Sequence, residues 1–278
     1  MKPPIDNGVI LVTGASSGIG AEIARQLGSR ARRLVLTARR TEQLETLRDE
    51  ILRKSPQLDV HVEPCDLSDT EATATWASEV ANRLGPIDVL VNNAGFGDRA
   101  PYDLADWEKV HRMVKVNVVA PALLTHQFLG PMVDRGRGGV LNIGSGAGLA
   151  LMPAAAAYVG TKHFLHGFTE VLRLDLTGTG VVVTEVCPGP VETEFDEQAG
   201  IDSETGGGLP PAFKITAEQC AREAIAGFEK GKPLVFPGRA SNALMVAQSV
   251  MPRPLMRRAM RKPSQQARAE AERGRRPS

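Results

Sequence analysis

Short runs of valine, leucine and isoleucine recur along most of the chain and alternate with longer stretches of helical periodicity. Six runs, at residues 9–12, 34–36, 60–62, 89–91, 140–143 and 181–186, are candidate strands. The stretches 19–27, 41–52, 69–84, 103–129 and 158–176 are candidate helices. Strands separated by helices of this length predict right-handed βαβ units and a parallel sheet. Because the runs are almost continuously apolar, we expect strands buried on both faces.

The predicted fold class is therefore α/β, with a doubly wound, Rossmann-type parallel sheet of about seven strands and helices on both faces. A chain of 278 residues with 42% hydrophobic side chains is sufficient for one large core. We assign residues 1–240 to this single domain and residues 241–278 to a C-terminal extension. Residues 193–215 mix Glu, Asp, Gly and Pro, which predicts a long loop serving as a substrate lid.

The net charge of +1 conceals an uneven distribution. Residues 253–278 carry nine basic and two acidic side chains, a net charge of +7, so the rest of the chain carries −6. That main body has no charge signature of a nucleic-acid binder, and we expect no nucleic-acid partner. The three cysteines and five histidines show no metal-ligand spacing, so we expect reduced cysteines, no metal and a cytoplasmic protein. We also expect no secretory signal and no membrane-spanning helix, because no uninterrupted apolar run approaches about 18 residues.

A glycine-rich turn follows the first candidate strand and opens the first candidate helix. Its glycines follow the spacing G-x3-G-x-G, with Gly14 for the tight turn, Gly18 for close approach of a pyrophosphate and Gly20 for helix packing. Exposed backbone N–H groups at the helix start favour an anionic phosphate. A flexible strand-to-helix turn without a ligand is the alternative. The predicted dinucleotide contacts are Gly14, Ser16, Ser17, Gly18, Ile19 and Gly20.

Two arginines, Arg39 and Arg40, follow the second candidate strand, where a dinucleotide fold contacts the adenosine ribose. An acidic residue there would accept hydrogen bonds from a 2′-hydroxyl and repel a 2′-phosphate, and the sequence has none. Arginine is suited to bidentate phosphate recognition. We therefore predict NADP(H) as the cofactor in preference to NAD(H). The alternative is that both arginines only begin a solvated helix.

Tyr158 and Lys162 are four residues apart, so on a helix they share one face. A free tyrosine has a pKa near 10 and is a poor base at neutral pH. A lysine ammonium on the same face favours the phenolate and lowers that pKa, which general acid/base catalysis requires. We therefore predict Tyr158 as the acid/base of the reaction.

Several motifs occur together and in order. They comprise the segment from Thr13 to Gly20, Cys65-Asp66-Leu67, Asn92-Asn93-Ala94-Gly95, Ser145, Tyr158-Val159-Gly160-Thr161-Lys162 and Pro188-Gly189-Pro190-Val191-Glu192-Thr193. With these motifs the chain resembles the short-chain dehydrogenase/reductase (SDR) family over roughly residues 9–236. The resemblance implies that Asp66 and Leu67 contact adenine, and that Asn93, Ala94 and Gly95 line the ribose and support the sheet. It also implies that Pro188, Gly189, Val191 and Thr193 hold the nicotinamide carboxamide.

The resemblance further implies a catalytic set of Asn117, Ser145, Tyr158 and Lys162. Ser145 would hydrogen-bond the substrate oxygen. Lys162 would also hold the nicotinamide ribose, and Asn117 would anchor a water that connects the lysine to solvent. Family members often carry a second serine at the position of Gly144, which leaves Ser145 as the single candidate here.

These residues predict an NADP(H)-dependent oxidoreductase that interconverts a ketone or aldehyde and an alcohol. We expect an apolar or lipid-like substrate and a homodimer or homotetramer. The alternative is a non-catalytic nucleotide-binding regulatory or membrane-associated scaffold protein with the same fold. The side chains expected around the substrate are Gly146, Gly148, Leu149, Leu151, Met152, Phe195, Ile201, Leu209 and Phe213.

The extension combines Met and Leu with Arg253, Arg257, Arg258 and Arg261 in a basic amphipathic stretch. We expect a helix packed on its own domain, followed by a disordered end from residue 263. Peripheral contact with an anionic membrane surface, or docking on a partner subunit, are the alternatives.

Overall fold

The computed structural model describes residues 2–195, 214–238, 242 and 251–274, and in them seven strands form one sheet. The strand order is β3-β2-β1-β4-β5-β6-β9, and every pair is parallel. The strands are β1 (Val9–Thr13), β2 (Arg33–Thr37), β3 (Asp59–Val62), β4 (Val89–Asn92), β5 (Gly138–Ile143), β6 (Val181–Val186) and β9 (Leu234–Val235). The predicted fold class is confirmed. The short seventh strand, β9, was not among the six predicted runs.

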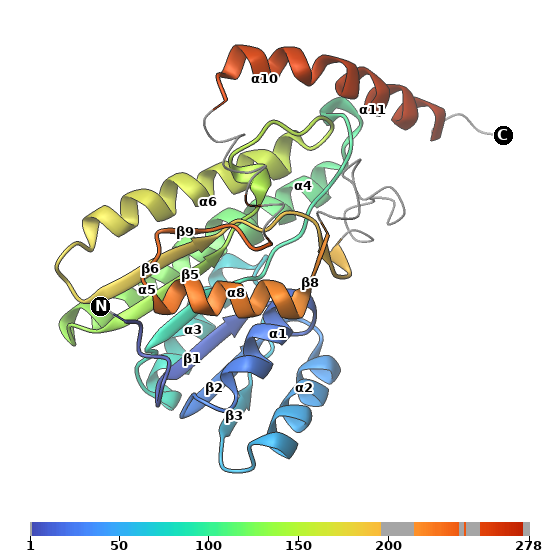
Figure 1. Cartoon of the computed structure of the whole chain (residues 1–278). Coiled ribbons are helices and arrows are strands. Elements are labelled where there is room, and N and C mark those ends of the chain that lie inside the picture. Colours follow the sequence, from blue (N-terminus) through green and yellow to red (C-terminus); the bar gives the residue numbers. More distant parts are fainter. Residues whose placement is uncertain (1, 196–213, 239–241, 243–250, 275–278) are drawn as a thin grey trace.

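Helices cover both faces of the sheet, as Figure 1 shows. In β1, Ile10 and Val12 pack on one face, and Val9 and Leu11 pack on the other. The first face is covered by α1 (Gly18–Leu27), α2 (Thr41–Lys54) and α8 (Ala217–Glu229). The second is covered by α3 (Thr70–Leu84), α5 (Ala120–Asp134) and α6 (Ala156–Asp175). This double burial explains why the strand runs are apolar without alternation.

The predicted helix over residues 103–129 is present, but it begins at Trp107 and ends at Asp134. The segment contains a 3₁₀ turn η1 (Tyr102–Leu104), helix α4 (Trp107–Val114), a π-helical turn η2 (Lys115–Val119) and then α5. Helix α4 begins at Trp107 because the Asp106 side chain accepts a hydrogen bond from the Glu108 N–H at 3.0 Å, as an N-cap.

The continuous helix Trp107–Asp134 is the one helix in the described residues that is long and apolar enough, by length and composition, to span a membrane. Its mean hydropathy is 1.2 over the relevant window. Here it packs against the domain through Met113, Leu124, Phe128 and Met132, which are all buried. A core helix of a globular domain meets the same criterion.

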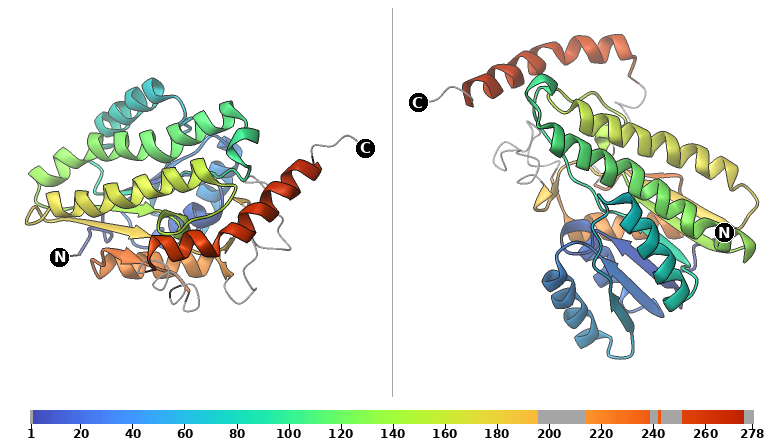
Figure 2. Two further views of the ribbon diagram at one scale, coloured as in Figure 1. Left: turned by 90° about the horizontal axis from the view of Figure 1, so that it is seen from above. Right: turned by 180° about the vertical axis from the view of Figure 1, so that it is seen from behind.

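The C-terminal extension forms two helices, α10 (Arg253–Ala259) and α11 (Arg261–Gly274). The prediction of a disordered end from residue 263 is therefore wrong for the described residues. Ala, Gln, Glu and Arg in this segment all favour a helix, and Arg268 forms an i, i+4 ion pair with Glu272 at 2.9 Å. Figures 1 and 2 show α10 and α11 crossing one end of the molecule, outside the two helix layers.

Much of the predicted substrate lid, residues 196–213, lies outside the described residues, as do Ile201, Leu209 and Phe213. At its two ends the chain forms a small parallel pair, β7 (Val191–Glu192) with β8 (Ile215–Thr216). Most of the apolar start of the extension, residues 243–250, is also outside the described residues.

Candidate active site

A cleft of about 1210 Å³ lies at the carboxyl ends of the strands, where the strand order reverses between β1 and β4. Open α/β sheets bind ligands at this switch point. Nearly all the predicted site residues line the cleft: Gly14, Ser16, Ser17, Gly18, Ile19, Arg39, Arg40, Asp66, Leu67, Asn93, Ala94, Gly95, Ser145, Tyr158, Lys162, Pro188, Gly189, Val191 and Thr193. Gly20 and Asn117 lie behind its wall. The cleft therefore brings both predicted sets, for cofactor and for catalysis, to one place.

The glycine turn is held against the loop that follows β4. Gly14 has a φ of +64°, and a Cβ there would lie 2.8 Å from both the Ala94 Cα and the Asn93 Nδ2. Asn93 Nδ2 donates to the carbonyl oxygens of Thr13 at 2.9 Å and Gly14 at 3.1 Å. A Cβ on Gly20 would also meet Asn93 Nδ2. Asn93 therefore has an architectural role in fixing the turn.

The start of α1 faces the cleft beside this turn. Gly18 has a φ of +56°, and a Cβ there would lie 3.1 Å from the Thr193 Cγ2. The first N–H groups of the helix have no partner within it, and the helix start carries a positive partial charge. The N–H groups at the start of α1, with a glycine that leaves space beside them, fit the pyrophosphate of a dinucleotide.

The two arginines after β2 have different surroundings. Arg40 donates to the Ser16 Oγ at 3.2 Å and the Ser17 Oγ at 2.8 Å, and pairs with Glu194 at 2.9 Å. Arg39 is exposed on the cleft wall, and no hydrogen bond or ion pair engages its guanidinium within the described part of the chain. Arg39 is therefore the one with a guanidinium available to an anionic ligand.

Asp66 and Leu67 lie on the cleft wall near Arg39. Burial opposes the charge of Asp66, but its Oδ1 accepts hydrogen bonds from Ser68 N at 3.0 Å and Ser68 Oγ at 2.8 Å. These bonds, with the charge of Arg39, hold the pKa of Asp66 below its usual value. Asp66 is thus a fixed anionic acceptor at the position where the SDR resemblance places adenine.

Tyr158 and Lys162 lie on one buried face of α6, as their spacing predicts. The Lys162 Nζ donates to the Ile143 carbonyl oxygen at 3.0 Å and lies 6.0 Å from the centre of the Tyr158 ring. Burial lowers the pKa of Lys162 to about 8, with Cys187 and Glu185 opposing the shift. A lysine that is charged below this pH and lies close to a tyrosine favours the phenolate.

Ser145 follows β5 directly and caps the 3₁₀ turn η3 (Gly146–Gly148). Its Oγ accepts a hydrogen bond from the Ala147 N–H at 3.1 Å, so its own O–H remains a donor. Ser145 and Tyr158 line the same cleft. Two hydroxyl-bearing side chains therefore belong to one cleft wall.

Asn117 is buried in the π-helical turn η2. Its Oδ1 accepts from Phe96 N at 3.2 Å, and its Nδ2 donates to Phe96 O at 2.9 Å and Thr161 Oγ1 at 3.1 Å. It therefore ties the loop after β4 to α6. Its expected role as an anchor for a water stays a prediction.

Sequence reasoning missed a buried polar pair behind the site. Glu185 of β6 is fully buried, and its Oε2 lies 2.7 Å from the Nδ1 of His166 on α6. This hydrogen bond raises the pKa of His166, which the sequence pattern suggests is a surface or packing residue. A Cβ on Gly144 would meet the Glu185 Oε1, which has no partner in the described residues. A glutamate inside the run Val-Val-Val-Thr-Glu-Val was the available signal.

Part of the cleft wall was also unforeseen. The predicted substrate contacts Gly146, Leu151, Met152 and Phe195 line the cleft, while Gly148 and Leu149 do not. The Phe195 and Tyr158 ring centres are 5.6 Å apart. Unpredicted wall residues come from the C-terminal helices: Met260, Pro263, Gln266, Ala267, Glu270 and Ala271.

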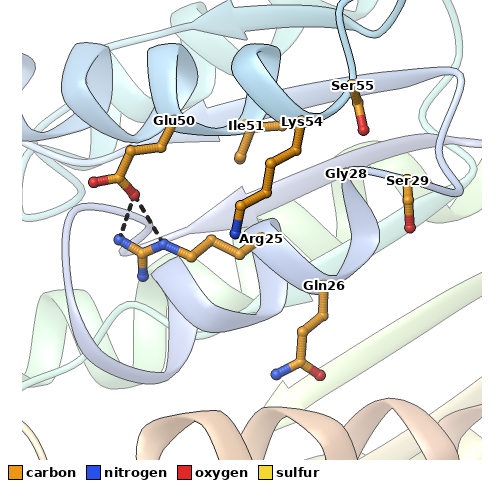
Figure 3. A pocket seen from close by; sticks show the side chains of 8 residues that line it. All are labelled: Arg25, Gln26, Gly28, Ser29, Glu50, Ile51, Lys54 and Ser55. Atoms are coloured by element: carbon orange, nitrogen blue, oxygen red, sulfur yellow. Dashed lines mark hydrogen bonds and ion pairs between the residues drawn. The ribbon is translucent and has the colours of Figure 1, made fainter.

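A smaller surface depression of about 220 Å³ lies at the carboxyl-terminal ends of α1 and α2, away from the cleft. Figure 3 shows Arg25 and Glu50 joined across it, with hydrogen bonds of 2.9 and 3.0 Å. The charges of Arg25 and Glu50 are thus paired with each other across the depression. In the described ranges no three His, Cys, Asp or Glu side chains are grouped to hold a metal ion.

Comparisons with known proteins agree with this geometry. A sequence model of the family described as short chain dehydrogenase matches residues 8–204. Human dehydrogenase/reductase SDR family member 7 is 34% identical over 220 residues, covering 77% of this chain and 65% of that relative. Sulfoacetaldehyde reductase 2 of Chromohalobacter salexigens is 38% identical over 193 residues, covering 67% of this chain and 74% of that one. A Sphingobium yanoikuyae short-chain dehydrogenase, solved with NADPH, has a TM-score of 0.78 and 29% identity, covering 86% of this chain and 91% of that one.

Proposed function

The chain belongs to the short-chain dehydrogenase/reductase family, and from this premise we propose that it is an NADP(H)-dependent reductase or dehydrogenase of a ketone or aldehyde and its alcohol. The observation that carries the proposal is the placement of Tyr158, Lys162 and Ser145 around one cleft beside the glycine turn. A non-catalytic scaffold with this fold would not need all three groups at the same cleft.

NADP(H) is the proposed cofactor, with NAD(H) the less favoured one. The uncommitted guanidinium of Arg39 suits a 2′-phosphate. The related Sphingobium structure contains NADPH, which supports the same choice. The residues proposed to hold the dinucleotide are those of the glycine turn, the loop after β4 and the segment from Pro188 to Thr193.

In the proposed reduction, bound NADPH supplies a hydride to the carbonyl carbon. Ser145 donates a hydrogen bond to the carbonyl oxygen and stabilises the charge that develops there. Tyr158 gives its phenolic proton to the same oxygen. The Lys162 ammonium stabilises the phenolate that remains, and oxidation of the alcohol reverses each proton movement.

We propose an apolar or lipid-like carbonyl substrate. The cleft beyond Tyr158 is bounded by Phe195, Leu151 and Met152. The relative named sulfoacetaldehyde reductase 2 supports an aldehyde as the substrate. We do not extend the sulfonate group of that aldehyde to the substrate proposed for this chain. The proposed location is the cytoplasm, with the three cysteines free.

The test is NADPH consumption over ketones, aldehydes and 3-oxoacyl compounds, followed by Tyr158→Phe on the best substrate. Removing the acid/base should lower kcat by about 100-fold to 10,000-fold, while the Kd for NADPH stays within about twofold. Tyr102→Phe is the matched control, because Tyr102 is the other tyrosine and is exposed outside the cleft wall. Near-normal turnover by Tyr158→Phe would disprove the acid/base assignment.

A further inference from the structure

The C-terminal helices have one inward stripe in an otherwise exposed surface. Met256 is buried, and Met260, Ala267 and Ala271 are partly buried. These positions recur every three or four residues when Pro263 is included, so they share one helical face. The arginines at 257, 258, 261 and 268 are exposed. The extension therefore presents small and apolar side chains to the domain and these arginines outward.

This inward stripe reaches the active-site cleft. Ala267 and Ala271 are one helical turn apart on α11, and both line the cleft that contains Tyr158 and Ser145. Met260 and Pro263 line it at the start of the helix. Figures 1 and 2 show α11 crossing the end of the molecule. The inward side of α11 thus forms part of the cleft wall, while the rest of the helix is exposed.

An ion pair fastens α11 to the rim of the cleft. The Arg268 guanidinium donates two hydrogen bonds to the Asp103 carboxylate, at 3.1 and 2.9 Å. Asp103 lies in η1, two residues after Pro101, which borders the cleft. Because the pair is bidentate, it sets the orientation of the helix as well as its position.

We propose that α11 is a specificity element: Ala267 and Ala271 form the outer wall for the substrate and set how large an apolar carbonyl compound reaches Tyr158. The inference rests on the proposed carbonyl-reductase function. Small side chains at both positions leave room for an extended body. The favoured substrates are therefore elongated.

The kinetic test uses Ala267→Trp with the straight-chain aldehydes from propanal to decanal as probes. A tryptophan directed into the cleft should lower kcat/KM for decanal about tenfold or more and leave propanal within about twofold. Ala269→Trp is the matched control, because Ala269 is exposed and absent from the cleft wall. NADPH affinity should be unchanged in both variants. The same decanal-to-propanal ratio in both variants would overturn the proposal.

The ion pair is tested by charge reversal. Arg268→Asp and Asp103→Arg should each increase amide hydrogen exchange in α11, by about twofold to fivefold because the pair is exposed. The double exchange, Arg268→Asp with Asp103→Arg, should restore protection. Single variants that exchange no faster than the wild type would show that the pair does not hold the helix.

Hydrogen exchange also separates this proposal from the proposed function. The wild-type protein could reduce no aldehyde or ketone, while NADPH with 1-decanol slows hydrogen exchange of its α11 amides. That result would contradict the reductase assignment and support the proposal that α11 forms the substrate wall. If the protein reduces aldehydes but its α11 amides exchange as fast as those of an unfolded peptide, the reductase function stands and the proposal that α11 forms the substrate wall is contradicted. Unprotected α11 amides, together with sedimentation on phosphatidylserine vesicles, would assign the extension to membrane contact instead.

Discussion

Arg39 and Arg40 are neighbours in sequence, but they have different roles in the structure. Arg40 is committed to Ser16, Ser17 and Glu194, whereas Arg39 faces the cleft without such partners in the described residues. We predict that Arg39→Asp weakens NADPH binding about tenfold to 100-fold, because a charge-assisted contact with the 2′-phosphate is lost and a repulsion is added. NADH binding should change by less than about threefold. Titration of cofactor fluorescence measures both.

Arg40→Asp is the informative companion, since it disturbs the glycine turn that both cofactors use. It should weaken NADPH and NADH alike. Arg32→Asp, at an exposed position away from the cleft, serves as the neutral control. Equal losses of NADPH affinity and NADH affinity in Arg39→Asp would refute the role of Arg39 in binding the 2′-phosphate.

The sequence alone indicated both arginines, because the partners of Arg40 become visible only in three dimensions.

The geometry of single residues was predictable where one motif determines it. Tyr158 and Lys162 share a helical face whatever the surrounding fold, and Gly14 needs a positive φ in its turn. Glu185 was missed because its importance comes from burial next to His166, 19 residues distant in sequence. Pairings of that kind depend on the register between α6 and β6, which no local pattern contains.

At the scale of elements, Glu185 and His166 tie strand β6 to helix α6 across the core. The Glu185 carboxylate raises the pKa of His166 above its ordinary value of 6.5. Stability from the charged pair is therefore fully present below pH 6.5 and is lost as the pH rises through the raised pKa. We predict that Glu185→Gln loses more thermal stability relative to the wild type at pH 5.5 than at pH 8.5.

Thermal unfolding across this range measures the difference, with Glu79→Gln, an exposed carboxylate on α3, as the control. The control should track the wild type at each pH. If the loss of thermal stability in Glu185→Gln is constant or grows as the pH rises, the proposed link between stability and the charge of His166 is contradicted. An NMR titration of His166, whose pKa should fall in the variant, provides a second readout.

The elements themselves were largely predictable, and the exceptions have identifiable causes. Apolar periodicity located six strands, but it could not detect the π-helical turn η2, where Asn117 bonds to the Phe96 backbone. Strand β9 is only two residues long and has no periodicity to detect. Helix α11 is polar nearly all round, and its inward face consists of alanines, which carry little hydrophobic signal.

At the scale of the whole molecule, α6 leaves an apolar face uncovered. Phe164, Val171 and Leu174 are 39%, 56% and 70% exposed. Their spacing of seven and three residues places them on one side of the helix. We propose that this face joins copies of the chain into a homodimer or homotetramer, since large apolar side chains are depleted from free surfaces.

Val171→Arg with Leu174→Arg should therefore reduce the mass measured by light scattering after size exclusion, because charges would be buried in the contact. Fold stability of each subunit should be little affected, as both positions are exposed in the single chain. Leu255→Arg on α10 is the control, because Leu255 is 59% exposed and belongs to another helix. Unchanged mass in the double variant would exclude α6 as the interface.

The contact between Gly144 and Glu185 also limits how this active site can diverge. A side chain at position 144 would meet the Glu185 carboxylate, so the serine common at this position in the family requires the Glu185 side chain to move. Replacing Glu185 by a shorter residue first would open that space, whereas the reverse order passes through a clash. The two positions are thus coupled, and the effect of a serine at position 144 depends on the residue at position 185.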